Sequence, residues 1–404
     1  MPVGSDGSPD IASNLTAMNS VSPDFPPLAP FGISRVGDLT DLDIIGIPVW
    51  FAVRPNSRCL AVSQGKGLNH ERARLTAIME AIEGAVAEQT RPLIAEFGTP
   101  AELAKRKLLA VPLRSLVRCH FSEFDPRRPR AWVRGVSHES NRAVYAPYEL
   151  VGLDMRDDFP WDYETFHVSS DGLGAGFDYA SAALSALLEL IERDGTTLSD
   201  GLGHLKGLSR PLIWQPGVHL GLDEAVTKVR NAGLEPHFFN KAGKIGVPIV
   251  SAMIVRPVCD KDGAGVRFSG GDACRFDAAE AALAALLEAV QSRLTNISGS
   301  RDDLDISQYE NLDLALPSMP DRGETLGQLA ARHTLPTNFS PSEALNFLVS
   351  QLAKAGYREV FFFDLPCPVE GVHVVRALVP GFRTFVENDV TALRLEDLIG
   401  AEFS

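Results

Sequence analysis

The sequence predicts one large α/β domain of mixed α+β type, in which internally repeated loop-helix units pack on β-sheet. Three observations predict this fold. Helical and strand-like patterns alternate from residue 31 to about residue 390 without a long linker. A glycine-bearing loop followed by an apolar-striped helix occurs three times, and so does a glycine followed by a β-branched run.

The loop-helix unit first occurs in "SQGKGLNHERARLTAIMEAIEG", residues 63–84. It aligns with residues 172–193 at an offset of 109 and with residues 271–292 at an offset of 208. Small and apolar positions match throughout, as in Ala73, Ala182 and Ala281. Two acidic positions match as well: Glu80, Glu189 and Glu288, then Glu83, Glu192 and Gln291. The apolar residues recur at helical spacing, and the glutamates lie off that stripe, so each pair shares one helix face.

The strand-like unit occurs at 41–53, 243–255 and 368–379, where β-branched residues follow a glycine. Two of these strands come after a helix, starting near Asp223 and near Ser342. Gly233 and Gly356 stand where a glycine ends a helix.

Both ends of the chain differ from this pattern. Residues 1–30 are rich in Ser, Pro, Asn and Asp and contain few large apolar side chains, so we expect a disordered tail. Residues 391–404 form a short C-terminal tail without a proline-rich motif. The expected catalytic domain therefore covers residues 31–390.

Composition excludes several classes of function. The formal net charge of −14 argues against a basic surface for nucleic acid or anionic lipid. No apolar run is long enough to span a membrane and no signal segment is visible, so a cytoplasmic protein is expected. The five cysteines form no C-x-x-C pair, which favours reduced, packed thiols over a zinc site.

The repeated glutamates predict a cation site. A single Glu pair on a helix is usually a solvated face, but three copies flanked by alanines indicate closely packed helices. Carboxylates brought together there need a compensating cation. Oxygen donors without a converging His or Cys favour Mg²⁺. A di-iron bundle is the rival explanation, but it requires Glu-x-x-His pairs on helices, which this chain lacks.

Positive charge near these carboxylates suggests phosphate binding. Lys66 between two glycines can supply a point charge with nearby backbone N–H groups, and the helix N-terminus that follows favours anions. Arg193 and Arg293 add further charge. There is no Walker-type P-loop. His70 and His167 could contact substrate and Cys274 could be a nucleophile, but a packed or surface position is the better explanation of each.

The three motifs "SQGKG…MEAIEG", "SSDGLGAG…LLELIERD" and "LLEAVQSRLTNISGSRDD" together resemble the YcaO family over roughly residues 30–390. The resemblance implies ATP and Mg²⁺ as cofactors and phosphorylation of a peptide backbone amide oxygen, giving an azoline or a thioamide. It implies a metal site of Glu80, Glu83, Glu189 and Glu192. It implies a nucleotide site of Ser63, Lys66, Ser170, Asp171, Arg193, Glu288, Gln291 and Arg293, with Lys66 and Arg193 as candidate stabilisers of the transferring phosphoryl group.

Departures from the family pattern concern specificity. Asp171 stands where the family usually has Asn, and the absent proline-rich tail favours a thioamide-forming or TfuA-associated relative. The resemblance implies a precursor peptide or protein as substrate and a separate TfuA-like or E1-like partner, with a homodimer as the expected assembly. Two alternatives stay open: a non-catalytic nucleotide-binding scaffold for a partner enzyme, and a ligase or kinase acting on a small molecule.

Overall fold

The structure is a computed structural model that describes residues 25–116, 124–156, 161–163, 165–206, 209–241, 243–256, 268–300, 323–333 and 338–382. Most of the expected N-terminal tail, the whole C-terminal tail, Cys119 and Cys259 lie outside the described residues.

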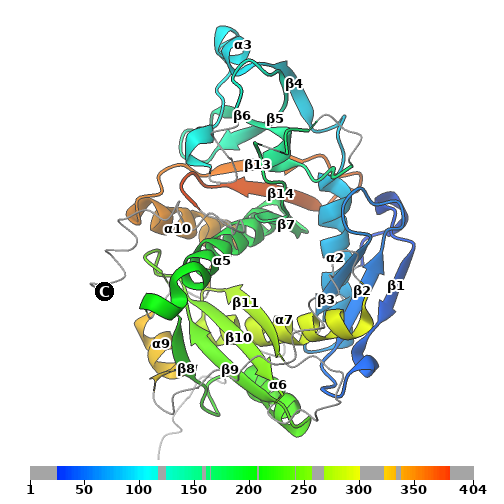
Figure 1. Cartoon of the computed structure of the whole chain (residues 1–404), viewed down its shortest axis with the longest axis vertical. Helices are drawn as coiled ribbons and strands as arrows, with labels where there is room; N and C mark the ends of the chain where they lie inside the picture. The colour runs from blue at the N-terminus through cyan, green and yellow to red at the C-terminus, as the bar shows by residue number, and fades with distance from the viewer. Residues whose placement is uncertain are drawn as a thin grey trace, which may run out of the picture.

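Three sheets, nearly all antiparallel, form the framework (Figure 1). The first contains β1 (Arg35–Asp38), β2 (Val49–Val53) and β3 (Val62–Lys66), in that order. The second runs in the order β11 (Phe268–Cys274), β10 (Ile249–Val255), β9 (Glu235–Asn240), β8 (Arg210–Ile213) and β12 (Glu324–Thr325). The third runs β4 (Ile94–Gly98), β5 (Arg130–Ser137), β13 (Phe361–Leu365), β14 (His373–Leu378) and β7 (Leu173–Gly176), and β6 (Ala143–Pro147) pairs with β5. Only β12 and β8 pair in parallel among these strands, so the mixed α+β prediction is confirmed.

Three long helices follow the edge strands β3, β7 and β11. They are α2 (His70–Ala87), α5 (Tyr179–Lys206) and α7 (Ala278–Ser298). The shorter helices are α3 (Pro100–Lys105), α4 (Tyr148–Val151), α6 (Leu220–Asn231), α9 (Leu326–Arg332) and α10 (Pro341–Lys354), together with the 3₁₀ turns Ala29–Phe31, Thr40–Leu42 and Leu113–Ser115. Among the described residues, no helix has the length and apolar character needed to cross a bilayer.

The strand-like repeat and the start of the loop-helix repeat form adjacent strands in the sheets. The predicted strands at 41–53, 243–255 and 368–379 contain β2, β10 and β14, and these pair antiparallel with β3, β11 and β7 respectively. Each repeat is therefore a strand pair covered by one helix. Gly233 and Gly356 have φ of 72° and 97° just beyond the ends of α6 and α10, which confirms them as helix-ending glycines.

The prediction of glycine-bearing loops before the helices was wrong for most of their length, because Gly65, Gly174 and Gly271 lie in edge strands and residues 169–172 of the second segment form the turn before β7. Their glycines let a helix backbone approach. A Cβ on Gly65 would meet Ala77 N at 2.0 Å, one on Gly174 would meet Ala182 O at 2.4 Å, and one on Gly271 would meet Ala289 N at 2.5 Å. Glycine inside a strand marks such close approach. The glycine in β3 therefore makes room for α2, the helix of its own unit.

The third unit packs one helical turn out of the aligned register. Gly65 contacts Ala73 and Ala77, but Gly271 contacts Ala285 and Ala289, which lie four positions beyond the aligned alanines. The N-cap Asn69 follows its glycine by four residues and Asp277 by six, so the longer connection shifts the contact. By packing, Glu288 therefore corresponds to Thr76 and Ser185 rather than to Glu80 and Glu189.

Three apolar clusters hold the units together. One joins α2 and α4 to β5, β7, β13 and β14, a second joins α6, α7 and α9 to the five-stranded sheet, and a third packs α5 and α10 against β14. The buried stripe predicted on the first helix is confirmed, since Leu75, Ile78 and Ile82 are at most 5% exposed.

Candidate functional site

The three strand-helix units contact one another in a cycle. Helix α2 packs on its own strand β3 and also contacts β7, α5 packs on β7 and contacts β11, and α7 packs on β11 and contacts β3. Figure 1 shows the three helices arranged around the centre of the molecule. Polar side chains from units far apart in sequence are thereby brought together.

Glu83 lies at the contact between α2 and β7. Its Oε1 accepts a hydrogen bond from the backbone N–H of Ala175 at 2.8 Å. Burial, and then the negative charges of Glu189 and Glu80, raise the pKa of Glu83 well above its usual range. Glu80 lies one turn earlier on the same helix and is exposed. The two acidic positions of α2 therefore differ, with Glu83 inside the cluster and Glu80 at its edge.

Glu189 and Glu192 place two more carboxylates beside it from α5. Glu189 Oε2 accepts from the Gly172 N–H at 3.2 Å, and burial raises the Glu189 pKa to about 7 even though Arg193 opposes the rise. Glu192 is 6% exposed, and burial followed by the charge of Glu288 raises its pKa well above the usual range. The structure thus brings Glu83, Glu189 and Glu192 into one electrostatically coupled group, as the repeat predicts.

Lys66 and Glu288 join the first and third units. Lys66 Nζ lies 2.7 Å from Glu288 Oε2, and both side chains are about three-quarters buried. Burial alone would raise the pKa of Glu288, but the Lys66 charge and hydrogen bond lower it. The backbone N–H of Lys66 donates to Thr76 Oγ1 at 2.9 Å. Lys66 therefore offers its charge to the site, while its own N–H is bonded within the unit.

Arg193 is surrounded by acids. Its Nε lies 3.6 Å from Asp171 Oδ1 and its Nη2 lies 3.9 Å from Glu189 Oε1. Burial disfavours the guanidinium charge, but Glu192, Glu189 and the other carboxylates outweigh it and raise the Arg193 pKa. Arg193 thus carries a firmly held positive charge beside the predicted metal ligands.

The remaining predicted nucleotide residues are less closely grouped. Ser63 lies in β3 and is paired with Ala52, Ser170 is exposed in the turn before β7, and Gln291 is partly buried on α7. Arg293 is 6% exposed and its Nε lies 2.8 Å from Asp43 Oδ2. This buried ion pair braces α7 against the segment before β2, so the structure gives Arg293 a packing partner of its own.

The carboxylates suit a hard divalent cation, although they are not a closed ligand set. Among the described residues, no three His, Cys, Asp or Glu side chains converge as a metal-binding group. Glu83 uses one oxygen on the Ala175 N–H of β7, and Glu189 uses one on the Gly172 N–H just before β7, with its other oxygen 3.9 Å from Arg193 Nη2. Burial is the main reason that the pKa values of these three carboxyls are raised, and a bound cation would favour their ionised forms. Oxygen-only donors are those that Mg²⁺ prefers.

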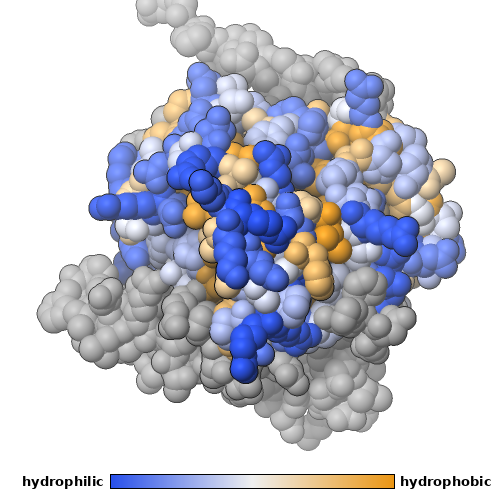
Figure 2. All heavy atoms as spheres, turned by 90° about the horizontal axis from the view of Figure 1, so that it is seen from above, coloured by the Kyte–Doolittle hydropathy of each residue, from blue (hydrophilic) through white to orange (hydrophobic). Residues whose placement is uncertain are grey.

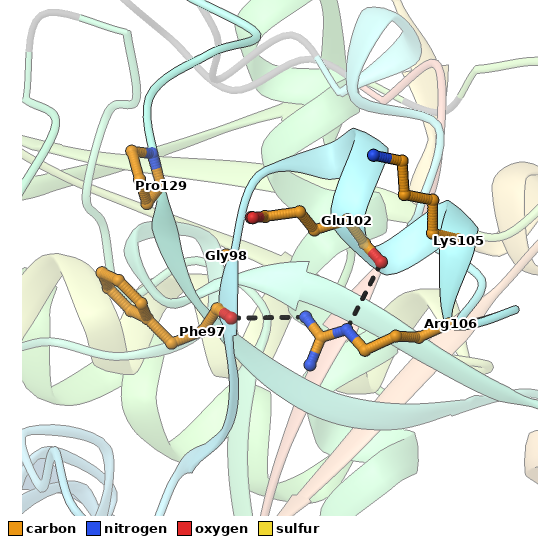
Figure 3. A pocket seen from close by; sticks show the side chains of 6 residues that line it. All are labelled: Phe97, Gly98, Glu102, Lys105, Arg106 and Pro129. Carbon is orange, nitrogen blue, oxygen red and sulfur yellow. Dashed lines mark hydrogen bonds between the residues drawn. The ribbon is translucent and has the colours of Figure 1, made fainter.

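A surface cavity of about 460 Å³ lies elsewhere, at the end of the molecule formed by β4 and α3 (Figure 3). Arg106 borders it and donates to the backbone oxygens of Phe97 and Glu102. Figure 2 shows this end of the molecule, where hydrophilic side chains gather beside apolar patches. The cavity lies at the end of the molecule away from Glu83, Glu189 and Glu192 (Figure 1). Its Arg106 is paired with Glu96, so we do not assign the chemistry to it.

Sequence reasoning missed Arg376 on β14. Its side chain is 0% exposed, and its charge lowers the pKa values of both Glu83 and Glu189. A lone Arg in a β-branched strand gives no signal of its own. Only the strand pairing of β14 with β7 brings it to the cluster.

Comparison with known proteins identifies the family of this chain. The sequence model of the family described as YcaO cyclodehydratase, ATP- and Mg²⁺-binding, matches residues 64–383. The chain belongs to the YcaO family. A protein of Rhizobium leguminosarum bv. trifolii, known as an uncharacterised protein in the tfuA 3′ region, is 34% identical over 383 residues, covering 91% of this chain and 88% of its own. An uncharacterised Methanothermobacter thermautotrophicus protein is 28% identical, with 89% and 91% covered.

Solved structures show the same fold. YcaO from Methanopyrus kandleri, bound with AMPPCP and Mg²⁺, matches with a TM-score of 0.65 at 21% identity, covering 89% of each chain. A heterocyclase in complex with substrate and cofactor matches with a TM-score of 0.66 at 19% identity, but this chain spans only half of it. The Escherichia coli microcin synthetase McbBCD complex with pro-MccB17 bound matches with a TM-score of 0.59 at 16% identity. The single YcaO-type fold is thereby confirmed, and ATP and Mg²⁺ are the cofactors of this family.

Proposed function

We propose that this YcaO protein uses ATP and Mg²⁺ to phosphorylate a backbone amide oxygen of a peptide or protein substrate, within a catalytic unit of residues 31–390. The observation that carries the proposal is the coupled cluster of Glu83, Glu189 and Glu192. Its carboxylates come from two helices. Burial raises all three pKa values, and the charge of Glu189 adds to the rise for Glu83 and Glu192. A divalent cation would reverse that penalty, and Mg²⁺ commonly links protein carboxylates to substrate phosphates.

We assign the metal to Glu80, Glu83, Glu189 and Glu192. Bound Mg²⁺ would neutralise charge on the phosphate oxygens. The positively charged side chains of the protein would stabilise the charge that remains on the phosphate. Lys66, hydrogen-bonded to Glu288, and Arg193, whose Nε lies 3.6 Å from Asp171 Oδ1, are positive charges at the border of the cluster. Such pre-positioned charges stabilise a transferring phosphoryl group without reorganisation during the reaction.

The phosphorylation makes a poor electrophile reactive. The amide oxygen attacks the γ-phosphorus and ADP leaves, so the oxygen becomes part of a phosphate group. A nucleophile then adds to the amide carbon, a proton is lost, and inorganic phosphate departs with the former amide oxygen. Cys274 is not that nucleophile, because its side chain is 0% exposed and burial raises its pKa.

We propose sulfide, delivered with a TfuA-like partner, as the nucleophile, so that the product is a thioamide. The supporting observation is the Rhizobium relative that lies in a tfuA 3′ region. If instead a Cys, Ser or Thr side chain of the substrate attacks, the product is an azoline. The requirement for ATP places the proposed reaction in the cytoplasm.

The test is to incubate the purified protein with a candidate precursor peptide, ATP, Mg²⁺ and sulfide, with and without the TfuA-like partner, and to measure the intact peptide mass. An oxygen-to-sulfur shift supports the thioamide, and loss of water shows the azoline. Glu192→Gln is the matched inactive control. No mass change with any partner, despite Mg²⁺-dependent ATP binding, would instead make the protein a nucleotide-binding scaffold.

A further inference from the structure

Arg376 occupies a position of the threefold repeat at which the other two units differ from it. It lies opposite Leu173 in the pairing of β14 with β7. Relative to the strand glycines Gly174, Gly65 and Gly271, the equivalent positions are Phe51 on β2 and Met253 on β10. Two units therefore carry an apolar side chain here, and the unit that carries Glu189 has a fully buried guanidinium instead.

A buried guanidinium needs strong partners, since an uncompensated charge is costly away from water. Arg376 Nε donates to the Val151 carbonyl at 3.1 Å, and Nη1 donates to the Asp171 carbonyl at 2.6 Å. These contacts tie β14 to the end of α4 and to the turn that precedes β7. The arginine is therefore held in place from two sides.

The Asp171 contact leads directly to the acidic cluster. The Asp171 carbonyl and the Gly172 N–H belong to one peptide group, and that N–H donates to Glu189 Oε2 at 3.2 Å. A cation bound at the carbonyl end polarises the peptide, which strengthens donation at the N–H end. The arginine, the peptide and the carboxylate thus form one continuous chain of hydrogen bonds.

The peptide itself cannot easily adopt another position. Gly172 has φ of +78°, its carbonyl accepts from the Ala377 N–H at 2.8 Å, and a Cβ there would meet Leu190 Cγ at 2.6 Å. The backbone that presents the N–H to Glu189 is therefore fixed by β14 on one side and by α5 on the other.

We propose that Arg376 is a positioning residue that, through the Asp171–Gly172 peptide group, holds the Glu189 carboxylate in place for the metal. This inference rests on the proposed function, because it assigns Glu189 to a Mg²⁺ site. Arg376 itself does not touch the nucleotide or the metal in this account. It acts on them through Glu189, and its charge also favours the ionised form of Glu83.

The test compares two buried arginines. Arg130 is 3% exposed, bonds two carbonyls and pairs with Asp162 at 2.6 Å, but it lies on β5 away from the glutamates. Arg376→Met and Arg130→Met should both lower the melting temperature. Mn²⁺ binding, measured by electron paramagnetic resonance with AMPPCP present, should weaken about tenfold or more in Arg376→Met and stay at the wild-type value in Arg130→Met.

Conservative variants keep the test decisive if a methionine variant does not fold. Lysine keeps the charge but cannot donate to both carbonyls as the guanidinium does. Arg376→Lys should therefore bind Mn²⁺ several-fold more weakly than the wild type, whereas Arg130→Lys should bind it with wild-type affinity. Wild-type Mn²⁺ affinity in a folded Arg376 variant would overturn the inference. A wild-type protein that binds no Mn²⁺ with AMPPCP would instead overturn the proposed function.

Discussion

Replacing Glu189 by Gln should stabilise the protein without ligand and weaken its binding of Mg²⁺ with ATP. The wild-type carboxyl has a pKa of about 7, against a reference value of 4.5 in the unfolded chain. The folded state therefore favours the protonated form. Its contribution to stability is present at low pH and is lost as the pH rises from 4.5 to about 7.

The size of this loss follows from the pKa difference. It corresponds to about 3 kcal/mol at a pH above both values. Because 28% of the Glu189 side chain is exposed, solvent screens part of the effect, and we expect about 1–3 kcal/mol. Gln keeps an oxygen that can accept the Gly172 N–H, so the variant removes charge without removing this contact.

The assay is thermal unfolding at pH 5 and pH 8, with and without Mg²⁺ and AMPPCP. At pH 8 without ligand, Glu189→Gln should melt roughly 1–4 °C above the wild type. At pH 5 the gap should nearly close. The added ligands should raise the melting temperature of the wild type far more than that of the variant. Glu139→Gln, at an exposed turn position, is the control. A variant that is less stable than the wild type at pH 8, or equally stabilised by ligand, would refute the reasoning.

Three further predictions use other parts of the structure. Gly271→Ala should lower the melting temperature by several degrees, because the new methyl meets helix backbone at 2.5 Å, whereas Gly270→Ala, with 3.9 Å of clearance, should change it little. Arg293→Met should lower the free energy of unfolding by about 3–5 kcal/mol, because it leaves Asp43 buried and unpaired. The added change Asp43→Leu should recover much of that loss, and calorimetry should find the nucleotide affinity of the double variant unchanged. Weakened nucleotide binding in the stable double variant would contradict the packing role. Lys66→Met should weaken AMPPCP binding at least tenfold in calorimetry while melting within a few degrees of the wild type, and equal affinity would remove Lys66 from the site.

The fold was largely predictable because its repeats are local. Apolar spacing placed the first helix, and the β-branched runs placed β2, β10 and β14. The strands containing Gly65, Gly174 and Gly271 were mistaken for loops because a glycine-rich segment has no side chains to show strand periodicity. These glycines are needed because a helix backbone packs against each strand, and only the assembled structure reveals that contact.

The site was predictable only as far as the repeat extends. The charge of Glu189 acts on both Glu83 and Glu192, so the repeat did indicate which acidic positions lie near one another. The pairing of Lys66 with Glu288 depends on the cyclic contact of the first and third units, and no single segment shows it. Arg376 reaches the cluster through strand pairing across about 200 residues, so sequence spacing carries no trace of it.

The central claim is that carboxylates of α2 and α5 together hold the metal-bound nucleotide. Calorimetric titration of AMPPCP with and without Mg²⁺ tests it most directly, using the wild type, Glu83→Gln from α2, Glu192→Gln from α5 and the Glu139→Gln control. We predict Mg²⁺-dependent binding in the wild type and the control, and a loss of at least tenfold in each of the two helix variants. Affinity that is unchanged in both helix variants would contradict the account.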